Sequence, residues 1–142
     1  MEVHVRQTDG VRFAIEAGKH TVISDQPEDN GGRDTGMTPP ELLLASLGSC
    51  AAFYAAQYLK ARNLAHIGVE VSVTAEKVKQ PARLDNFQVS VTSPVALTED
   101  QAQAMYRSVH QCLVHNTMVS TPQIEIRIKA ERAERAERVA AH

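Results

Sequence analysis

Two cysteines, Cys50 and Cys112, are the residues of this chain best suited to covalent chemistry. Cys50 lies in the apolar stretch "LLLASLGSCAAFYAA", and Cys112 lies in "HQCLVHNTM". A thiolate can attack the O–O bond of a peroxide to give a sulfenic acid, which a nearby thiol converts into a disulfide. That step needs the two Cα atoms to approach to about 5.5 Å. Because free cysteines also pack as small hydrophobes, a purely structural role for both stays open.

A reactive thiol needs a lowered pKa, and the expected helix positions do not supply one. Cys50 should lie about 15 Å from the start of its helix, where the helix dipole no longer acts. Cys112 should lie near the end of a second helix, where the dipole disfavours a thiolate. We therefore expect activation by a cation or by donors from elsewhere in the chain. Arg33, in "GGRDTG", is the best-placed cation, although a solvated loop arginine is the alternative.

Two histidines, His110 and His115, flank Cys112. Either could act as a proton donor or a cation near the sulfurs, and either could equally be a surface histidine or a satisfied core histidine. A metal site built from these histidines and the two cysteines is a weaker hypothesis, because the ligand spacings of familiar zinc sites are absent.

The composition excludes several classes of protein. The chain has 142 residues, which fits one domain, and its formal net charge of −2 gives no argument for nucleic acid or an anionic membrane as partner. Two cysteines are too few for a secreted disulfide scaffold. The N-terminus carries no signal-peptide pattern, and the apolar stretch 42–56 is shorter than the roughly 20 residues of a membrane span. We expect a cytoplasmic protein with reduced thiols.

The first half of the chain predicts three strands, a long loop and a helix. "EVHVR", "VRFAIEA" and "HTVIS" should form a meander with tight turns at Asp9-Gly10 and Ala17-Gly18. The polar loop "DQPEDNGGRDTGMTPP" is long enough to suggest a function. The helix should begin at Pro39 or Pro40 and end near Asn63. It is apolar almost all round, so we expect burial on most of its sides.

The second half predicts a hairpin, a helix and a strand. "VEVSVTAEKV" and "NFQVSVTS" should pair, and Thr98 with Gln101 matches a capping box. Cys112 falls on the apolar face of the helix that follows, and "QIEIRIK" should be a last strand. The order βββ-α-ββ-α-β is an α+β pattern. We expect one domain over residues 1–130 and a charged, solvated C-terminal tail over residues 131–142.

Two motifs resemble those of the OsmC-like family, which includes the organic hydroperoxide resistance proteins. They are "GGRDTGMTPPELLLASLGSCAA" and "CLVHNTM", and they match in order and spacing. The resemblance covers about residues 1–129 and implies an intertwined homodimer with two central helices packed between sheets. It also implies thiol-dependent reduction of organic hydroperoxides, with Cys50 attacking and Cys112 resolving. It implies no organic cofactor.

The chain departs from the family pattern at one position. The peroxidase branches carry a glutamate ten residues before the first cysteine, clamped to an arginine that activates the thiol. Here that residue is Pro40, and the neighbouring Glu41 should point half a turn away from Cys50. Glu41 is suited to the first turn of the helix, and it could still orient an arginine. The chain is therefore similar to a less characterised branch.

The leading hypothesis is a thiol peroxidase that uses Cys50, Cys112 and Arg33, with a hydroperoxide as substrate and an external dithiol as reductant. Apolar side chains could line its peroxide pocket, namely Leu47, Phe53 and Met118. The alternative is a non-catalytic, stress-associated binding protein with the same fold, which Pro40 favours. A metal-binding protein is the third hypothesis.

Overall fold

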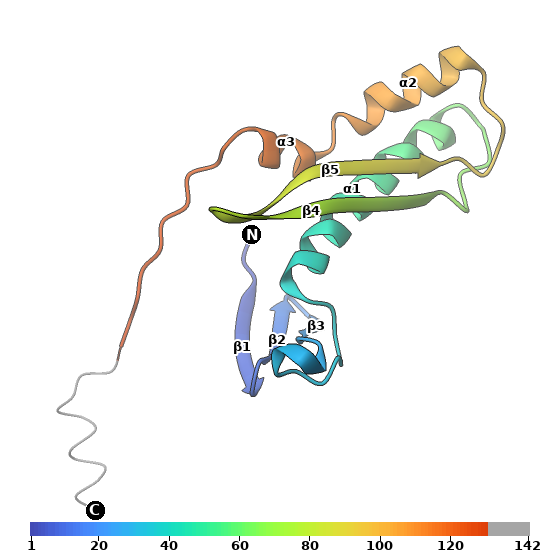
Figure 1. Ribbon diagram of the computed structural model, residues 1–142. Helices are drawn as coiled ribbons and strands as arrows, with labels where there is room; N and C mark the ends of the chain where they lie inside the picture. The colour runs from blue at the N-terminus through green and yellow to red at the C-terminus, as the bar shows by residue number, and fades with distance from the viewer. Residues whose placement is uncertain (131–142) are drawn as a thin grey trace, which may run out of the picture.

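The computed structural model describes residues 1–130, and the tail expected over residues 131–142 lies outside the described residues (Figure 1). Two small antiparallel sheets and three α-helices make an α+β fold, as the sequence predicts. In chain order the elements are β1 (His4–Asp9), β2 (Arg12–Ala17), β3 (His20–Ser24), the 3-10 helix η1 (Glu28–Asn30), α1 (Pro39–Ala61), β4 (Glu70–Lys79), β5 (Ala82–Thr92), α2 (Glu99–Val109) and α3 (Leu113–Val119).

The predicted meander of β1, β2 and β3 is confirmed. Gly10 and Gly18 begin the two connections, with φ of 50° and 59°. Backbone with positive φ favours glycine, so these two residues fix where the chain reverses. The sheet lies beyond the N-terminal end of α1, apart from the hairpin of β4 and β5 (Figure 1).

The start of α1 is fixed by its cap and its first residue. The Thr38 side chain accepts from the Glu41 N–H, and the Glu41 carboxylate accepts from the Thr38 N–H, which completes a capping box. Pro39 occupies the first helical position, where its missing N–H is no loss. The predicted helix is therefore confirmed, with its end at Ala61 close to the expected one.

The expectation that α1 is buried on most sides is wrong. Only one side of α1 packs against the hairpin and α2, whereas Phe53 is 56% exposed and Leu43 is 40% exposed. No described element covers the face of α1 that carries Leu43 and Phe53. By length and composition alone α1 could also cross a membrane, which is a test that core helices pass too.

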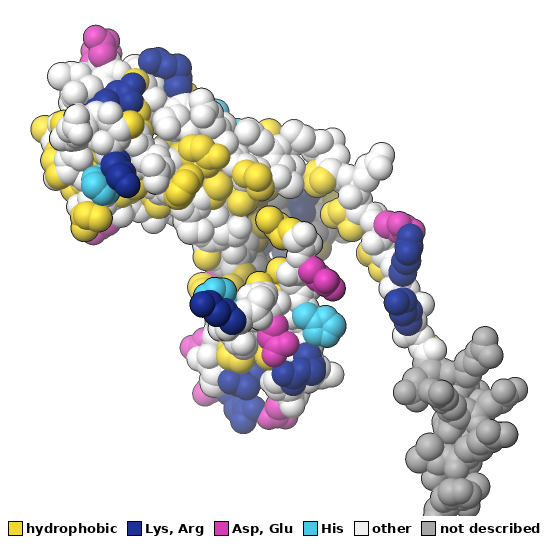
Figure 2. All heavy atoms as spheres, turned by 180° about the vertical axis from the view of Figure 1, so that it is seen from behind, with side chains coloured by type: hydrophobic (Ala, Val, Ile, Leu, Met, Phe, Trp, Pro, Cys, Tyr) yellow, Lys and Arg dark blue, Asp and Glu magenta, His cyan; other side chains and the backbone are white. Residues whose placement is uncertain are grey.

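The predicted hairpin is confirmed as β4 and β5, which pair from Glu70↔Thr92 to Lys79↔Ala82. The core lies where this hairpin, α1 and α2 meet. Leu59 is fully buried at its centre, beside Ala55, Tyr58 and Met105. Seen from behind, apolar side chains gather on this part of the molecule, while charged side chains crowd the part below it (Figure 2).

The second helical region is divided differently from the prediction. The capping box of Thr98 and Gln101 starts α2 as expected. However, α2 ends at Val109, and the chain turns before α3 begins at Leu113. Cys112 is therefore not on α2, contrary to the expectation, but is the N-cap residue of α3. The dipole of α3 therefore favours negative charge at Cys112, which is the opposite of the expectation.

The last predicted strand is absent from the described residues. The segment that contains "QIEIRIK" is extended but pairs with no other strand (Figure 1). Its alternating residues Ile124, Ile126 and Ile128 are each more than four-fifths exposed. The alternation is real, but a strand needs a neighbour to receive its hydrogen bonds, and no described strand lies beside it.

Candidate functional site

The fold brings the two cysteines into contact. Cys50 is half-buried near the middle of α1, and Cys112 is 1% exposed at the N-terminus of α3. The two thiols are close enough for each to shift the pKa of the other, and both cysteines are free. Residues far apart in the sequence thus form a single pair, which is the arrangement that the peroxide chemistry requires.

The surroundings of Cys50 favour its thiolate. Burial raises the pKa of the Cys50 thiol, but hydrogen bonds from the Cys112 thiol and from the N–H groups of Val114 and Leu113 outweigh this effect. The net result is a Cys50 pKa below its ordinary value. The N–H donors come from the first turn of α3. This second helix supplies the hydrogen bonds that favour the Cys50 thiolate, which α1 cannot supply at the position of Cys50.

The surroundings of Cys112 favour its neutral thiol. Burial and the adjacent Cys50 sulfur raise the pKa of Cys112, while the N–H of His115 opposes them. That N–H lies 3.4 Å from the Cys112 Sγ, which serves as the helix cap. The pair is therefore unequal: Cys50 is the better nucleophile, and Cys112 is held as a thiol that donates to it.

Small residues set the position of Cys50. Gly48 faces the hairpin, and a Cβ at that position would lie 3.0 Å from the Val73 Cγ2. Two residues further along an α-helix, the side chain points to nearly the opposite side. The close approach of α1 to β4 therefore turns Cys50 away from the hairpin, toward α3.

Alkylation should distinguish the two cysteines. Because iodoacetamide reacts with thiolates, we expect it to modify Cys50 first, with a rate that increases with pH through a midpoint below that of a free thiol. Peptide mass spectrometry after alkylation at a series of pH values measures both sites. Cys112→Ala removes a donor to the Cys50 sulfur and should move the midpoint to higher pH. Equal rates at both cysteines would contradict the assignment.

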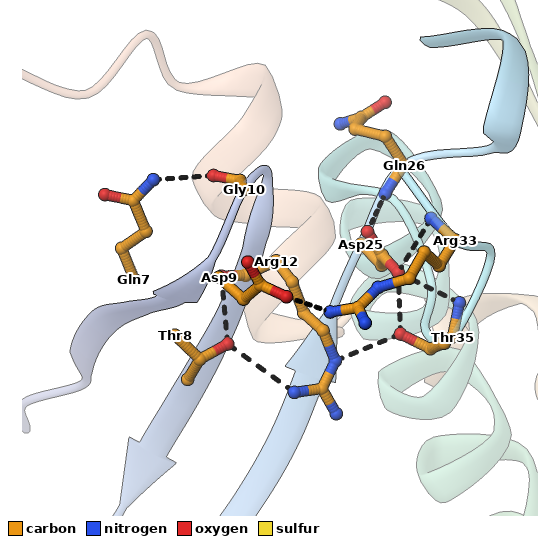
Figure 3. Close-up of polar contacts among 9 residues, drawn as sticks. All are labelled: Gln7, Thr8, Asp9, Gly10, Arg12, Asp25, Gln26, Arg33 and Thr35. Carbon is orange, nitrogen blue, oxygen red and sulfur yellow. Dashed lines mark hydrogen bonds and ion pairs between the residues drawn. The ribbon is translucent and has the colours of Figure 1, made fainter. Parts of the chain in front are cut away.

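Arg33 lies in a separate polar cluster at the three-stranded sheet (Figure 3). Its guanidinium is paired with the carboxylate of Asp9, and its side chain is 63% exposed. It is not among the causes of the Cys50 pKa shift. Within one chain, therefore, the structure does not bring Arg33 to the thiols.

Asp25 organises the loop that carries Arg33, and sequence reasoning missed it. Its carboxylate, 1% exposed, accepts from the N–H groups of Gln26 and Arg33 and from both the N–H and the hydroxyl of Thr35 (Figure 3). The Thr35 hydroxyl and these N–H groups outweigh burial and lower the pKa of Asp25 to about 2. The sequence does place Asp25 directly after the predicted strand "HTVIS", which could have marked it as a residue that organises the loop.

Glu41 does not reach the cysteines. It completes the capping box with Thr38, whose N–H and hydroxyl lower the pKa of the Glu41 carboxyl with a smaller contribution from Lys77. This is the role in the first helical turn that the sequence suggested, and within residues 1–130 no arginine forms a hydrogen bond or ion pair with Glu41.

The rings of His110 and His115 meet edge to face, and neither ring forms a hydrogen bond to a cysteine within residues 1–130. The ring centroids of His110 and His115 are 5.0 Å apart, and the Tyr106 ring lies 4.4 Å from the His110 ring at a tilt of 51°. Within residues 1–130, no group of three or more histidine, cysteine or acidic side chains is gathered as a metal site would require.

An open groove of about 530 Å³ lies between α1 and α3, and neither cysteine is among its lining residues. Tyr54, one helical turn after Cys50, lines it together with Gln111 and Leu113, which flank Cys112 in the chain. Of the residues expected to line a peroxide pocket, Leu47 is buried in the core and Phe53 is exposed, and neither they nor Met118 line this groove. Sequence reasoning missed Tyr54, because a tyrosine in a long apolar helix gives no sign of the face on which it lies.

A family model described as OsmC-like protein matches residues 31–127. This span includes both cysteines and Arg33. No curated protein matches the sequence of the chain.

Solved structures share this fold at low sequence identity. An osmotic stress induced and detoxification response protein from Psychrobacter arcticus has a TM-score of 0.74 at 21% identity, over 81% of this chain and 85% of that one. An OsmC-like protein from Mycoplasma pneumoniae has a TM-score of 0.68 at 18% identity, over 84% and 87%. An organic hydroperoxide resistance protein from Elizabethkingia anophelis has a TM-score of 0.61 at 18% identity, over 85% and 90%.

Proposed function

Because the chain belongs to the OsmC-like family, we propose that it reduces organic hydroperoxides with its two cysteines, Cys50 attacking and Cys112 resolving. The observation that carries this proposal is the contact between two thiols whose pKa values are shifted in opposite directions. The occurrence of organic hydroperoxide resistance proteins among the structures with this fold supports a peroxide-related stress function.

In the first step the Cys50 thiolate attacks the terminal oxygen of the hydroperoxide. The S–O bond forms as the O–O bond breaks, the cysteine is oxidised to a sulfenic acid, and the alkoxide leaves as an alcohol after it takes up a proton. The N–H groups of Leu113 and Val114 stabilise the thiolate before the attack. Desolvation by the surrounding helices strengthens these hydrogen bonds.

In the second step Cys112 attacks the sulfenic sulfur of Cys50. A disulfide forms, the sulfenic oxygen leaves as water, and the substrate has received two electrons in all. Since both cysteines of the chain are then oxidised, an external dithiol must restore them by thiol–disulfide exchange. No step requires an organic cofactor. In a reducing compartment such as the cytoplasm, both cysteines would be kept as thiols between reactions.

Stoichiometric oxidation tests the proposal. One equivalent of cumene hydroperoxide added to the reduced protein should lower the titratable thiols from two to none and the mass by two hydrogen atoms. In Cys112→Ala the disulfide cannot form, and dimedone should label a sulfenic acid at Cys50. Wild-type protein that keeps both thiols after this treatment would refute the proposed function.

We also propose an intertwined homodimer. The exposed apolar face of α1, which includes Leu43 and Phe53, and the unpaired segment with Ile124, Ile126 and Ile128 both support it. An extended segment with unpaired backbone groups is suited to strand addition to a second copy. The three-stranded sheet, which stands apart at one end of α1, would then contact the partner (Figure 1).

Arg33 stays the proposed cation for the thiolate, contributed by a second copy. Within its own chain it is paired with Asp9 and makes no contribution to the Cys50 pKa. In the alkylation experiment, Arg33→Gln should then raise the pH at which the alkylation rate of Cys50 is half of its maximum. Glu41 would fix the start of α1. That it also orients an arginine stays a prediction.

A non-catalytic binding protein is the second candidate. It is favoured by Pro40 at the position where peroxidase branches carry glutamate, since no clamp between that residue and an arginine can form here. This candidate predicts that the two thiols survive stoichiometric hydroperoxide, so the same titration decides between the two.

A further inference from the structure

A single hydrogen bond ties the end of α2 to α1. The Ser108 hydroxyl donates to the Tyr54 carbonyl oxygen, and the two oxygen atoms are 3.3 Å apart. Within residues 1–130 this is the only hydrogen bond between the two helices, which also pack together in the core around Leu59 and Met105. Figure 1 shows α2 running back along the C-terminal half of α1, so the hydrogen bond lies at the end of α2 that leads to Cys112.

The Ser108 hydroxyl is used between helices rather than within one. A serine inside a helix often points to solvent or bonds to the carbonyl four residues back, which here is that of Ala104. The Ser108 hydroxyl instead donates its proton to the neighbouring helix. The Tyr54 carbonyl can accept it in addition to its own helical N–H, because a carbonyl oxygen has two lone pairs. The contact therefore couples α2 to α1.

This hydrogen bond lies about one helical turn from each cysteine. Tyr54 follows Cys50 by four residues on α1, so in the regular helix its N–H donates to the Cys50 carbonyl. A rise of 1.5 Å per residue places Tyr54 about 6 Å along the axis from Cys50. Ser108 precedes Cys112 by four residues. The hydrogen bond therefore joins the two segments close to the sulfur atoms that are proposed to react.

The backbone between Ser108 and Cys112 is hydrogen-bonded throughout. The Gln111 N–H donates to the Ser108 carbonyl at 3.0 Å. The Cys112 N–H donates to the Val109 carbonyl, also at 3.0 Å, and the Cys112 carbonyl then accepts the first helical N–H of α3, from Asn116. Two of these bonds span three residues, as in tight turns. Because they leave the segment little freedom, the position of Ser108 determines that of Cys112.

We propose that Ser108 is a positioning residue for the thiol pair and holds Cys112 beside Cys50 through its hydrogen bond to Tyr54. Apolar packing is non-directional, so the core alone allows α2 to shift along α1. A hydrogen bond depends steeply on distance and angle, and it fixes that shift. Without the bond, Cys112 would meet Cys50 less often and the disulfide would form more slowly. The inference rests on the proposed function, because it names the residue that brings the resolving thiol within reach.

Glutathione redox buffers test the positioning without a hydroperoxide. Oxidised glutathione takes two electrons from the thiol pair and leaves as two molecules of reduced glutathione, so the equilibrium gives the effective concentration of Cys112 at Cys50. A displacement of about 1 Å can slow a reaction by roughly a hundredfold. Since Ser108→Ala leaves the apolar core intact, we expect it to lower the effective concentration by about tenfold. Ser108→Thr keeps the hydroxyl and should stay within about twofold of wild type.

Ser93→Ala is the matched control. The Ser93 hydroxyl, on a half-buried residue like Ser108, accepts from the Val95 N–H at 3.2 Å. It lies in the loop that precedes α2, at the other end of that helix from Cys112. The substitution therefore removes one comparable hydrogen bond away from the thiols. It should leave the effective concentration at the wild-type value.

Alkylation of Cys50 gives a second measurement. The N–H groups of Leu113 and Val114, directly after Cys112 in the chain, favour the Cys50 thiolate. If Ser108 positions this segment, Ser108→Ala should move the midpoint of the alkylation rate of Cys50 to higher pH. Ser108→Thr should restore the wild-type midpoint, which a general loss of stability would not explain.

The outcomes keep this inference separate from the peroxidase activity. Both measurements lack hydroperoxide, so they decide the role of Ser108 even if the protein does not consume cumene hydroperoxide. A lower effective concentration in Ser108→Ala alone supports the positioning role. Equal values for Ser108→Ala and wild type overturn it, and so do equal losses in Ser108→Ala and Ser93→Ala. If the proposed function also holds, dimedone should label more of the Cys50 in Ser108→Ala than in wild type after stoichiometric hydroperoxide.

Discussion

Cys50→Ser is expected to reduce the steady-state consumption of cumene hydroperoxide to the rate without protein, a loss of roughly a thousandfold or more. A serine hydroxyl stays protonated near neutral pH, so the hydrogen bonds from Cys112, Val114 and Leu113 would have no thiolate to stabilise. The assay follows hydroperoxide loss in the presence of a dithiol. The isosteric change leaves packing almost unaltered, so a loss of activity without a loss of thermal stability is the expected pattern.

Cys112→Ser is the matched control, because it keeps the nucleophile and removes the resolving thiol. It should consume about one equivalent of hydroperoxide in a burst and then stop or slow, since the sulfenic acid of Cys50 cannot form the internal disulfide. Identical steady-state rates for wild-type protein and Cys50→Ser would refute the assignment of Cys50 as the attacking residue.

Leu59→Ala is expected to lower the free energy of unfolding by about 2–5 kcal/mol. Leu59 is fully buried on α1, among Ala55, Tyr58 and Met105. The substitution removes apolar contacts and leaves a cavity where α1, α2 and the hairpin meet. Urea unfolding followed by circular dichroism measures the change.

Ile67→Ala is the matched control, since it removes a similar aliphatic volume from a side chain that is 83% exposed. Its effect should stay within about 0.5 kcal/mol. If both substitutions destabilised the protein equally, the core would not be centred where the structure places it. Leu59 lies nine residues from Cys50 on the same helix, so the reactivity of Cys50 in Leu59→Ala also reports whether α1 keeps its position.

The strands and helix starts were predictable from the sequence because each has a local cause. Glycines with positive φ fix the turns of the meander, and capping boxes fix the starts of α1 and α2. The end of α2 was not predictable, since the apolar spacing continues past Val109 to Cys112 while the chain turns. A periodic pattern shows which residues can share a face but not where the backbone stops being helical.

The proximity of the two thiols was predictable from the sequence, whereas the groups that surround them were not. The sequence indicated that two remote cysteines could meet and that donors from elsewhere would be needed. It could not show that those donors are the backbone N–H groups of Leu113 and Val114, because backbone groups carry no sequence signal. Likewise, the pairing of Arg33 with Asp9 depends on the fold of the loop around Asp25, which only the assembled sheet determines.

Cys112 is at once the proposed resolving thiol and the N-cap residue of α3. In the reduced protein, the N–H groups of Leu113 and Val114 favour negative charge on the Cys50 sulfur, and the Cys112 sulfur accepts the N–H of His115. A disulfide carries no charge and is a poorer acceptor, so each oxidation event would leave the first turn of α3 less well anchored. Under the proposed function the short helix would loosen on oxidation and tighten on reduction, and its local order would report the oxidation state of the two cysteines.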